Sequence, residues 1–221
     1  MRDSFSNYLK TIYEASFTKS ITTNKQVATL MGVLPGSVTE AVSNLVAAGL
    51  VNRQKYHGIS LTATGYQEVC QLMYRYRLCE VWLDQTIHLP LPAIPEQAWL
   101  MAAIDNAVLL QQLASKLNQP SRSPFGGKLV LQTFEQASEW QSLETILVGQ
   151  TIVIESYLEN PSTIRYCLHS QIASQQVFKC IGQATDIEMM TLLDSQQREL
   201  LISTVVARHI YVSLIADHDT F

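Results

Sequence analysis

The stretch "TTNKQVATLMGVLPGSVTEAVSNLVAAG", residues 22–49, holds two helical patterns separated by a turn. The first begins with a Thr/Asn cap and stops at Gly32. The second follows a Pro-Gly turn, begins at about Ser37 and ends at Gly49. An amphipathic pattern from about Ser4 to Ala15 comes before both. A supporting helix followed by two short helices and a tight turn predicts a helix-turn-helix.

The last of these helices has a core face and a polar face. Val38, Val42 and Leu45 recur at i, i+4 and i+7 and are expected to be buried. Small and amide side chains on the other face would allow close approach to base edges and phosphates in a major groove. The alternative is an ordinary solvated face. The candidates for base contacts are Ser37, Thr39, Glu40, Ser43 and Asn44.

The segment "LVNRQKYHGISLTATG", residues 50–65, predicts a β-hairpin directly after that helix. A hairpin in this place is the wing of a winged helix-turn-helix. Its basic side chains Arg53 and Lys55, together with Lys25, are candidates for phosphate contacts. His57, at the tip of the wing, is interpreted as a solvated turn residue and retained as a further candidate for DNA contact.

Composition and charge narrow the class of protein. A chain of 221 residues with 47% apolar residues is long enough for two or three domains with cores and too hydrophobic to be disordered. The net charge of −4 is unevenly spread: residues 1–67 carry six basic and three acidic groups, the remainder nine and sixteen. A basic head on an acidic body is weak evidence for nucleic acid. No nucleophile-base constellation or phosphate loop indicates an enzyme.

Other sequence features concern location and cysteines. No window is apolar for the length of a membrane span, and the N-terminus lacks the apolar core of a signal peptide, so we expect no membrane partner and a cytoplasmic protein. The scattered cysteines predict neither disulfides nor a zinc site and are interpreted as buried free thiols. They are Cys70, Cys79, Cys167 and Cys180.

Beyond the wing, the sequence pattern is first helical and then, after about residue 143, typical of strands. A long helix capped by Thr62 or Thr64 is followed by two short helices between Pro95 and Leu113. Their apolar surface exceeds what one small domain can bury, which predicts a partner subunit. Short alternating runs after about residue 143 predict strands, with one short helix near residues 160–172.

The motifs "YLKTIYE", "VSNLVAAGLV", "GISLTATG", "YRYRLCEVWL" and "PSRSPFGG" occur in an order that resembles the DtxR/MntR family of metal-dependent repressors. The resemblance covers nearly the whole chain. It implies an α+β multidomain protein: a winged helix-turn-helix at 1–67, a helical dimerisation domain at 68–130 and an SH3-like (FeoA-like) β-barrel at 143–215. It also implies a homodimer on an inverted-repeat operator of double-stranded DNA.

The same resemblance assigns metal-ligand positions, and most hold side chains that cannot bind a metal. Glu80 is the one usual ligand that is retained. The other positions are occupied by Asn7, Tyr76, Pro95, Trp99, Ala102 and Ala103. Because a transition-metal site needs about four to six donors, the usual manganese or iron site is expected to be absent. A rearranged site drawn from Glu80, Cys79, Asn7 and Tyr76 is the alternative, and it would hold manganese or iron.

Two further ligand sets follow from the resemblance. An anion-linked site is matched by Arg77 and Ser123, although Arg77 pairing with Glu80 at i, i+3 is the favoured interpretation. A glutamate and a glutamine that reach the metal from the C-terminal domain align with Asn160 and Thr163.

The leading hypothesis is a homodimeric, sequence-specific DNA-binding regulator that acts as a repressor, without the usual metal and with no cofactor. In one alternative it responds to another ligand or to oxidation of a thiol such as Cys79. In an alternative of another class, it is an interaction protein that does not bind DNA and acts through its SH3-like domain.

Overall fold

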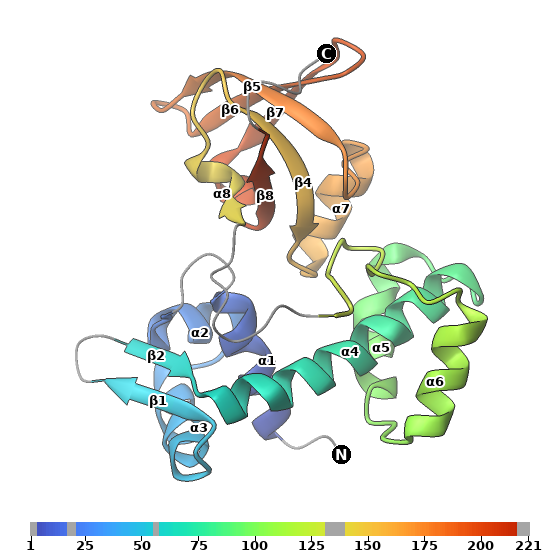
Figure 1. Cartoon of the computed structure of the whole chain (residues 1–221). Coiled ribbons are helices and arrows are strands. Elements are labelled where there is room, and N and C mark those ends of the chain that lie inside the picture. The colour runs from blue at the N-terminus through green and yellow to red at the C-terminus, as the bar shows by residue number, and fades with distance from the viewer. Residues whose placement is uncertain (1–3, 17–20, 55–57, 131–139, 216–221) are drawn as a thin grey trace.

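The computed structural model describes residues 4–16, 21–54, 58–130 and 140–215. Figure 1 shows a helical N-terminal part with a hairpin, a long helix that leads away from it to a pair of short helices, and a β-rich C-terminal part stacked above that helix. The expected α+β multidomain fold is therefore confirmed.

The N-terminal part is a winged helix-turn-helix. Thr23 caps the second helix by accepting a hydrogen bond from the Gln26 amide, and Gly32 ends it in the left-handed region at φ 64°. The third helix begins at Pro35, two residues earlier than expected, because proline is favoured in the first turn, where its missing N–H costs nothing. The elements are α1 (Ser4–Ala15), α2 (Asn24–Met31), α3 (Pro35–Ala47), β1 (Val51–Gln54) and β2 (Gly58–Leu61).

Helix α4 (Ala63–Gln85) connects the winged helix to the helical part. Its N-cap is Thr62, whose hydroxyl accepts from the Gly65 amide. A Cβ at Gly65 would lie 1.9 Å from the Leu50 carbonyl oxygen, so glycine allows α4 to start directly against the chain entering the wing. The 3-10 turn η1 (Leu91–Ala93) leads into α5 (Ile94–Met101), and Asn106 caps α6 (Ala107–Lys116).

The C-terminal part is a six-stranded antiparallel sheet in the order β3-β8-β4-β5-β6-β7. It is consistent with an SH3-like domain, but within the described residues its edge strands β3 and β7 do not pair to close a barrel. Helix α7 follows β4, as expected. The elements are β3 (Gln141–Ser142), η2 (Leu143–Thr145), β4 (Thr151–Tyr157), α7 (Pro161–His169), β5 (Val177–Ala184), β6 (Met189–Asp194), β7 (Glu199–Ser203), α8 (Thr204–Ala207) and β8 (Ile210–Leu214).

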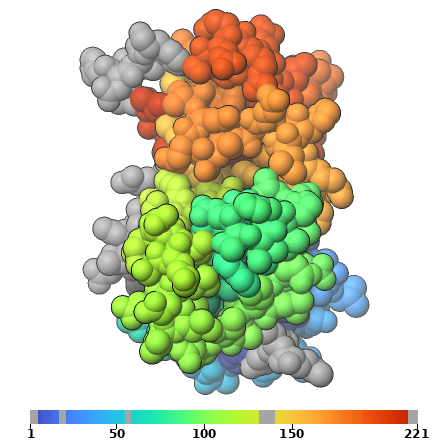
Figure 2. Space-filling view, turned by 90° about the vertical axis from the view of Figure 1, so that its right-hand side faces the viewer, coloured from blue at the N-terminus to red at the C-terminus, as the bar shows by residue number. Residues whose placement is uncertain are grey.

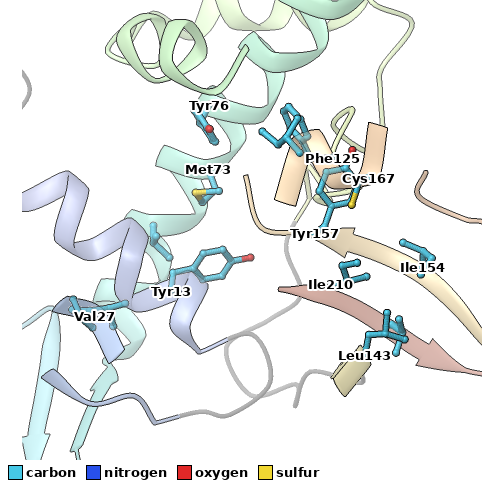
Figure 3. Close-up of a cluster of buried hydrophobic side chains, with 14 of the residues drawn as sticks. Tyr13, Val27, Met73, Tyr76, Phe125, Leu143, Ile154, Tyr157, Cys167 and Ile210 are labelled. Atoms are coloured by element: carbon cyan, nitrogen blue, oxygen red, sulfur yellow. The ribbon is translucent and has the colours of Figure 1, made fainter. Parts of the chain in front are cut away.

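One hydrophobic cluster extends from the winged helix through α4 into the sheet. Figure 3 shows Tyr13, Met73 and Tyr76 on the helical side of this cluster and Phe125 and Tyr157 on the side of the sheet. No single helix of the described chain is long and apolar enough to cross a membrane, and α2 and α3 meet the length and composition criteria only as a pair bent by 113°.

Candidate DNA interface and candidate metal centre

Helix α3 presents a polar face to solvent. Val38, Val42 and Leu45 are fully buried, and this burial fixes the rotation of the helix. The predicted base-contacting residues Ser37, Thr39, Glu40, Ser43 and Asn44 are all exposed. The structure thus brings the predicted set together on one surface.

Thr39 is the residue of this set that is held by the neighbouring helix. Its hydroxyl accepts from the Asn24 side-chain amide at 2.8 Å and lies 3.1 Å from the Pro35 carbonyl oxygen, to which it donates. Ser43 donates to the Thr39 carbonyl at 2.8 Å. The bond from Asn24 joins α3 to α2, and the other two lie within α3, so two of the five candidates already have partners within the protein.

The wing and the first turn of α2 carry the predicted phosphate contacts. Arg53 is exposed on β1 opposite Ile59, and Lys25 is exposed on α2. Lys55 and His57, the other two candidates on the wing, lie outside the described residues. An exposed leucine, Leu34, immediately precedes α3 with 77% of its surface accessible, a feature that helical periodicity did not single out.

Two of the family's metal positions meet in space, and the positions as a set hold few donor atoms. Tyr76 of α4 and Trp99 of α5 meet edge to face, with ring centroids 5.6 Å apart. Ala102 is buried and Ala103 exposed, and neither methyl group can bind a metal. The remaining two, Asn7 and Pro95, are half-buried on α1 and at the start of α5.

Glu80, the retained ligand, is fully buried on α4. Neither of its carboxylate oxygens has a hydrogen-bond partner among the described residues. Burial, together with the nearby negative charge of Glu159, holds the pKa of Glu80 well above its usual range, and the cations Arg77 and Lys10 offset this only in part.

A lysine ammonium belongs to the cluster of buried charged groups around Glu80, which consists of Lys10, Glu14, Arg77, Glu80 and Glu159. Lys10 of α1 forms ion pairs with Glu14, one turn along the same helix, and with Glu159, whose oxygen is 3.8 Å from Nζ. Burial alone would lower the pKa of Lys10, but the two glutamates outweigh it and raise the pKa above its usual value. None of these three residues was predicted from the sequence to belong to a site. Lys10 and Glu14 are spaced i, i+4, a signal of an ordinary helix pair, and nothing in the sequence connects Glu159 with them.

These side chains do not fit a manganese or iron centre. The family positions supply one carboxylate, and the cation next to it is an ammonium that is covalently part of the chain. Across the described ranges, no group of three or more His, Cys, Asp or Glu side chains is arranged to hold a metal ion. Cys79, offered as an alternative ligand and as a thiol switch, is buried on α4 with about 1% of its surface accessible.

Arg77 and Ser123 have structural partners. The Arg77 guanidinium donates to the Lys128 carbonyl at 2.6 Å rather than to Glu80, so the favoured pairing of Arg77 with Glu80 is wrong. The reason is that the turn at 121–128 folds back over α4: a Cβ at Gly127 would lie 2.5 Å from Arg77 Nε. The Ser123 hydroxyl accepts from the Phe125 amide at 3.3 Å within the same turn.

The alignment of Asn160 and Thr163 with ligands from the C-terminal domain needs a correction. The Asn160 side chain caps α7 by accepting from the Thr163 amide at 2.8 Å, and Thr163 is buried. The carboxylate that reaches the cluster belongs to Glu159, one residue earlier. Its partner is the Tyr76 hydroxyl, which donates to Glu159 Oε2 at 2.6 Å. His169 is exposed and His209 half-buried, and neither belongs to the cluster.

Comparisons with known proteins agree with this architecture. Residues 1–59 match the family model "Iron dependent repressor, N-terminal DNA binding domain". Over the full length, the chain is similar to the manganese regulator SloR, with 24% identity, TM-score 0.80 and coverage of 97% of this chain and 100% of that one. IdeR of T. acidophilum has 18% identity, TM-score 0.82 and coverage of 97% and 100%. ScaR with bound Cd²⁺ has 25% identity, TM-score 0.76 and coverage of 96% and 99%. No curated protein matches the sequence.

A winged helix with an exposed third helix, joined to a helical part and a C-terminal β domain, is the architecture of a class of winged-helix transcriptional regulators. Residues 1–59 are similar to the DNA-binding domain of iron-dependent repressors, and the whole chain has the fold of the DtxR/MntR regulators. The resemblance found in the sequence is confirmed.

Proposed function

We propose that this protein is a sequence-specific DNA-binding transcriptional repressor of the DtxR/MntR type that works without the usual manganese or iron. The observation that carries the proposal is the exposed polar face of α3, held between α2 and the wing. Ser37, Glu40, Ser43 and Asn44 contact base edges in the major groove, while Lys25 and Arg53 bind phosphates. Lys55 and His57 belong to the same proposed interface.

The protein acts as a homodimer on an inverted repeat. Support comes from exposed apolar side chains in the helical part, with accessible fractions of 69% for Val108, 50% for Leu109 and 64% for Leu100. Figure 2 views the molecule from the side on which these helices lie. We assign residues 68–130 to dimerisation, with 1–67 as the DNA-binding domain and 143–215 as the SH3-like domain.

Control by metal is replaced in this chain. The similar proteins include a manganese regulator and a ScaR structure with bound Cd²⁺, whereas here the positions that the family resemblance assigns to ligands hold tyrosine, tryptophan, proline and alanine side chains. Aromatic packing of Tyr76 against Trp99 occupies the space between α4 and α5. The protein therefore needs no cofactor to adopt its DNA-binding pose.

The test of DNA binding uses the full chain and DNA from upstream of its own coding sequence. Specific binding should weaken steeply as salt rises, because each phosphate contact releases counterions. Asn44→Ala should lose discrimination between operator and unrelated DNA, while the matched surface variant Lys179→Ala, at an exposed position on β5, should bind like the unaltered protein. Equal affinity for operator and unrelated DNA at every salt concentration would contradict the proposal.

The test of metal independence is a calorimetric titration with Mn²⁺ and Fe²⁺. We expect no stoichiometric site of micromolar or tighter affinity, and no change in operator affinity when a chelator is added. A stoichiometric site, or loss of DNA binding on chelation, would show that a rearranged metal centre controls the protein.

A further inference from the structure

The positively charged Lys10 ammonium lies beside Tyr76 and Trp99, which stand at two of the family's metal-ligand positions. Its side chain is about 16% exposed, and those of its partners Glu14 and Glu159 are 10% and 9% exposed. A charge in such a place is costly unless it is paired on several sides. The structure supplies those partners.

The partners are of two kinds. Carboxylates of Glu14 and Glu159 form ion pairs with the ammonium. The faces of two aromatic rings cover it elsewhere: Nζ lies 4.9 Å from the centre of the Tyr76 ring and 5.7 Å from that of Trp99. Both distances are within the range in which a cation is attracted to a ring face.

The aromatic residues are the ones that replace metal ligands. Tyr76 and Trp99 stand at two positions that the family resemblance assigns to ligands, and their rings are useless to a transition metal but suited to an ammonium. The aromatic residues at these two positions are therefore chemically consistent with each other. Together they replace a site for a metal ion by a site for an ammonium ion.

The groups that meet at Lys10 come from all three parts of the protein. Lys10 and Glu14 belong to α1 of the winged helix, Tyr76 and Trp99 to α4 and α5, and Glu159 to the chain between β4 and α7 of the C-terminal part. Tyr76 also binds Glu159 directly, at 2.6 Å. A cation at this point ties the DNA-binding part to the other two.

We propose that the Lys10 ammonium is a built-in cation that takes the place of the metal and fixes the orientation of the winged helix relative to the rest of the chain. The proposal rests on the proposed function only in its link to DNA. Lys10 is a positioning residue: it acts through Glu159, Tyr76 and Trp99 and does not contact DNA.

The first experiment compares Lys10→Met with Lys116→Met, an exposed lysine of α6, in the full chain. Lys10→Met removes the charge while keeping most of the volume, so the two carboxylates of Glu14 and Glu159 lose their cation. We expect a fall in Tm of about 5 to 15 °C for Lys10→Met and less than about 2 °C for Lys116→Met. Hydrogen exchange should quicken in α1 and in the first turn of α7. An unchanged Tm and exchange pattern would overturn the proposal.

A double-mutant cycle measures whether the effect passes through Glu159. Glu159→Gln keeps an oxygen for the Tyr76 hydroxyl but removes the charge. The losses in Tm caused by Lys10→Met and Glu159→Gln should be less than additive, because each removes the same interaction. Additive losses would show that Lys10 merely fills space. Glu159→Gln alone keeps every side-chain volume nearly unchanged, so its Tm and hydrogen exchange test the ion pair even if Lys10→Met fails to fold.

Chemical rescue separates charge from packing. In Lys10→Ala, n-propylammonium has the same three carbons and nitrogen as the part removed. We expect this ion at tens of millimolar to restore a substantial part of the lost Tm, whereas 1-propanol or sodium chloride at equal concentration should restore none. Equal effects of n-propylammonium and 1-propanol would contradict a role for the charge.

These measurements of stability and exchange need no DNA, so they decide the role of Lys10 even if the unaltered protein binds no operator. If it does bind, Lys10→Met should weaken operator binding at least tenfold, and n-propylammonium should restore binding by Lys10→Ala. Normal DNA binding by Lys10→Met would overturn the link between this cation and the DNA-binding pose while leaving the proposed function intact.

Discussion

The Tyr76 hydroxyl donates a hydrogen bond to the Glu159 carboxylate at 2.6 Å, joining α4 to the C-terminal part across 83 residues of sequence. Both groups are largely buried, and burial together with the Glu159 charge raises the pKa of Tyr76 well above its usual value, so it donates as a neutral phenol. A hydrogen bond from a neutral donor to a buried carboxylate is among the stronger polar contacts in a protein.

Replacing Tyr76 by Phe should lower the free energy of unfolding by about 1.5–3 kcal/mol, because a hydrogen bond to a charged group is lost while the ring stays in place. Urea denaturation of the full chain measures this. Tyr74→Phe, at a half-buried position on the same helix, serves as the control and should change stability by less than about 0.5 kcal/mol. Equal effects of the two substitutions would show that the contact with Glu159 contributes nothing.

Acid should weaken the attachment of the turn at 121–128 to the sheet. Arg122 donates to Glu155 Oε2 at 2.7 Å, and Ser213 donates to Glu155 Oε1 at 2.7 Å. Burial on its own would raise the pKa of Glu155, but the hydrogen bonds from Ser213 and Arg122 together lower it below the usual value. The ionised carboxylate therefore stabilises the folded state above the unfolded pKa of about 4.3, and this contribution is lost as pH falls through the lower folded pKa.

The corresponding substitution is Glu155→Gln. It should reduce stability at pH 7 by roughly 1–3 kcal/mol, since charged hydrogen bonds become neutral ones. Thermal denaturation from pH 7 to pH 3 should show the difference from the unaltered protein shrinking toward the acid end. A difference that stays constant with pH would mean that ionisation of Glu155 is not its source.

Gly126 should tolerate no side chain. It has φ +85°, and a Cβ there would lie 2.1 Å from the Glu155 carbonyl oxygen, a backbone atom that cannot move aside easily. Gly126→Ala should cost at least about 2 kcal/mol of stability from backbone strain and overlap. At Gly36, at the start of α3, a Cβ meets nothing within 4 Å, so Gly36→Ala should be neutral or stabilising by up to about 1 kcal/mol. Urea denaturation of Gly126→Ala and Gly36→Ala tests whether the backbone at Gly126 lies as close to the Glu155 carbonyl as described.

Arg53 on the wing should contribute to affinity without reading sequence. Arg53→Ala should weaken binding to operator and to unrelated DNA by similar factors and reduce the slope of log affinity against log salt by about 1. Fluorescence anisotropy at four or more salt concentrations measures both quantities. A loss confined to the operator would instead indicate that Arg53 reaches a base edge.

Local sequence patterns predicted the elements well. The first helix was expected at Ser4–Ala15 and is found there, and the residues Thr62 and Gly32 that were expected to begin and end helices do so. Capping and periodicity act over one or two turns, so their signals are complete within a short stretch of sequence. The start of α3 at Pro35 rather than Ser37 has an equally local cause in the preference of proline for the first turn.

Partners far apart in the sequence were predicted poorly. Arg77 was expected to bind Glu80 because they are neighbours on one helix, yet it binds the Lys128 carbonyl, 51 residues away. Asn160 was assigned a place in the ligand set, yet its side chain is used to cap α7. In both cases the competing contact depends on how another segment folds back, and helical spacing carries no information about that.

The sequence by itself determined the winged helix, the α4 helix, the strand-rich C-terminal part and the loss of donor atoms at the family's ligand positions, since these depend on residue type and short-range pattern. Only the tertiary structure decided which groups gather around the family's ligand positions. Lys10, Tyr76, Trp99 and Glu159 come from separate segments, and they meet because buried apolar residues from all three parts pack into one cluster. Burial in that cluster is also the physical reason why the charge needs its partners.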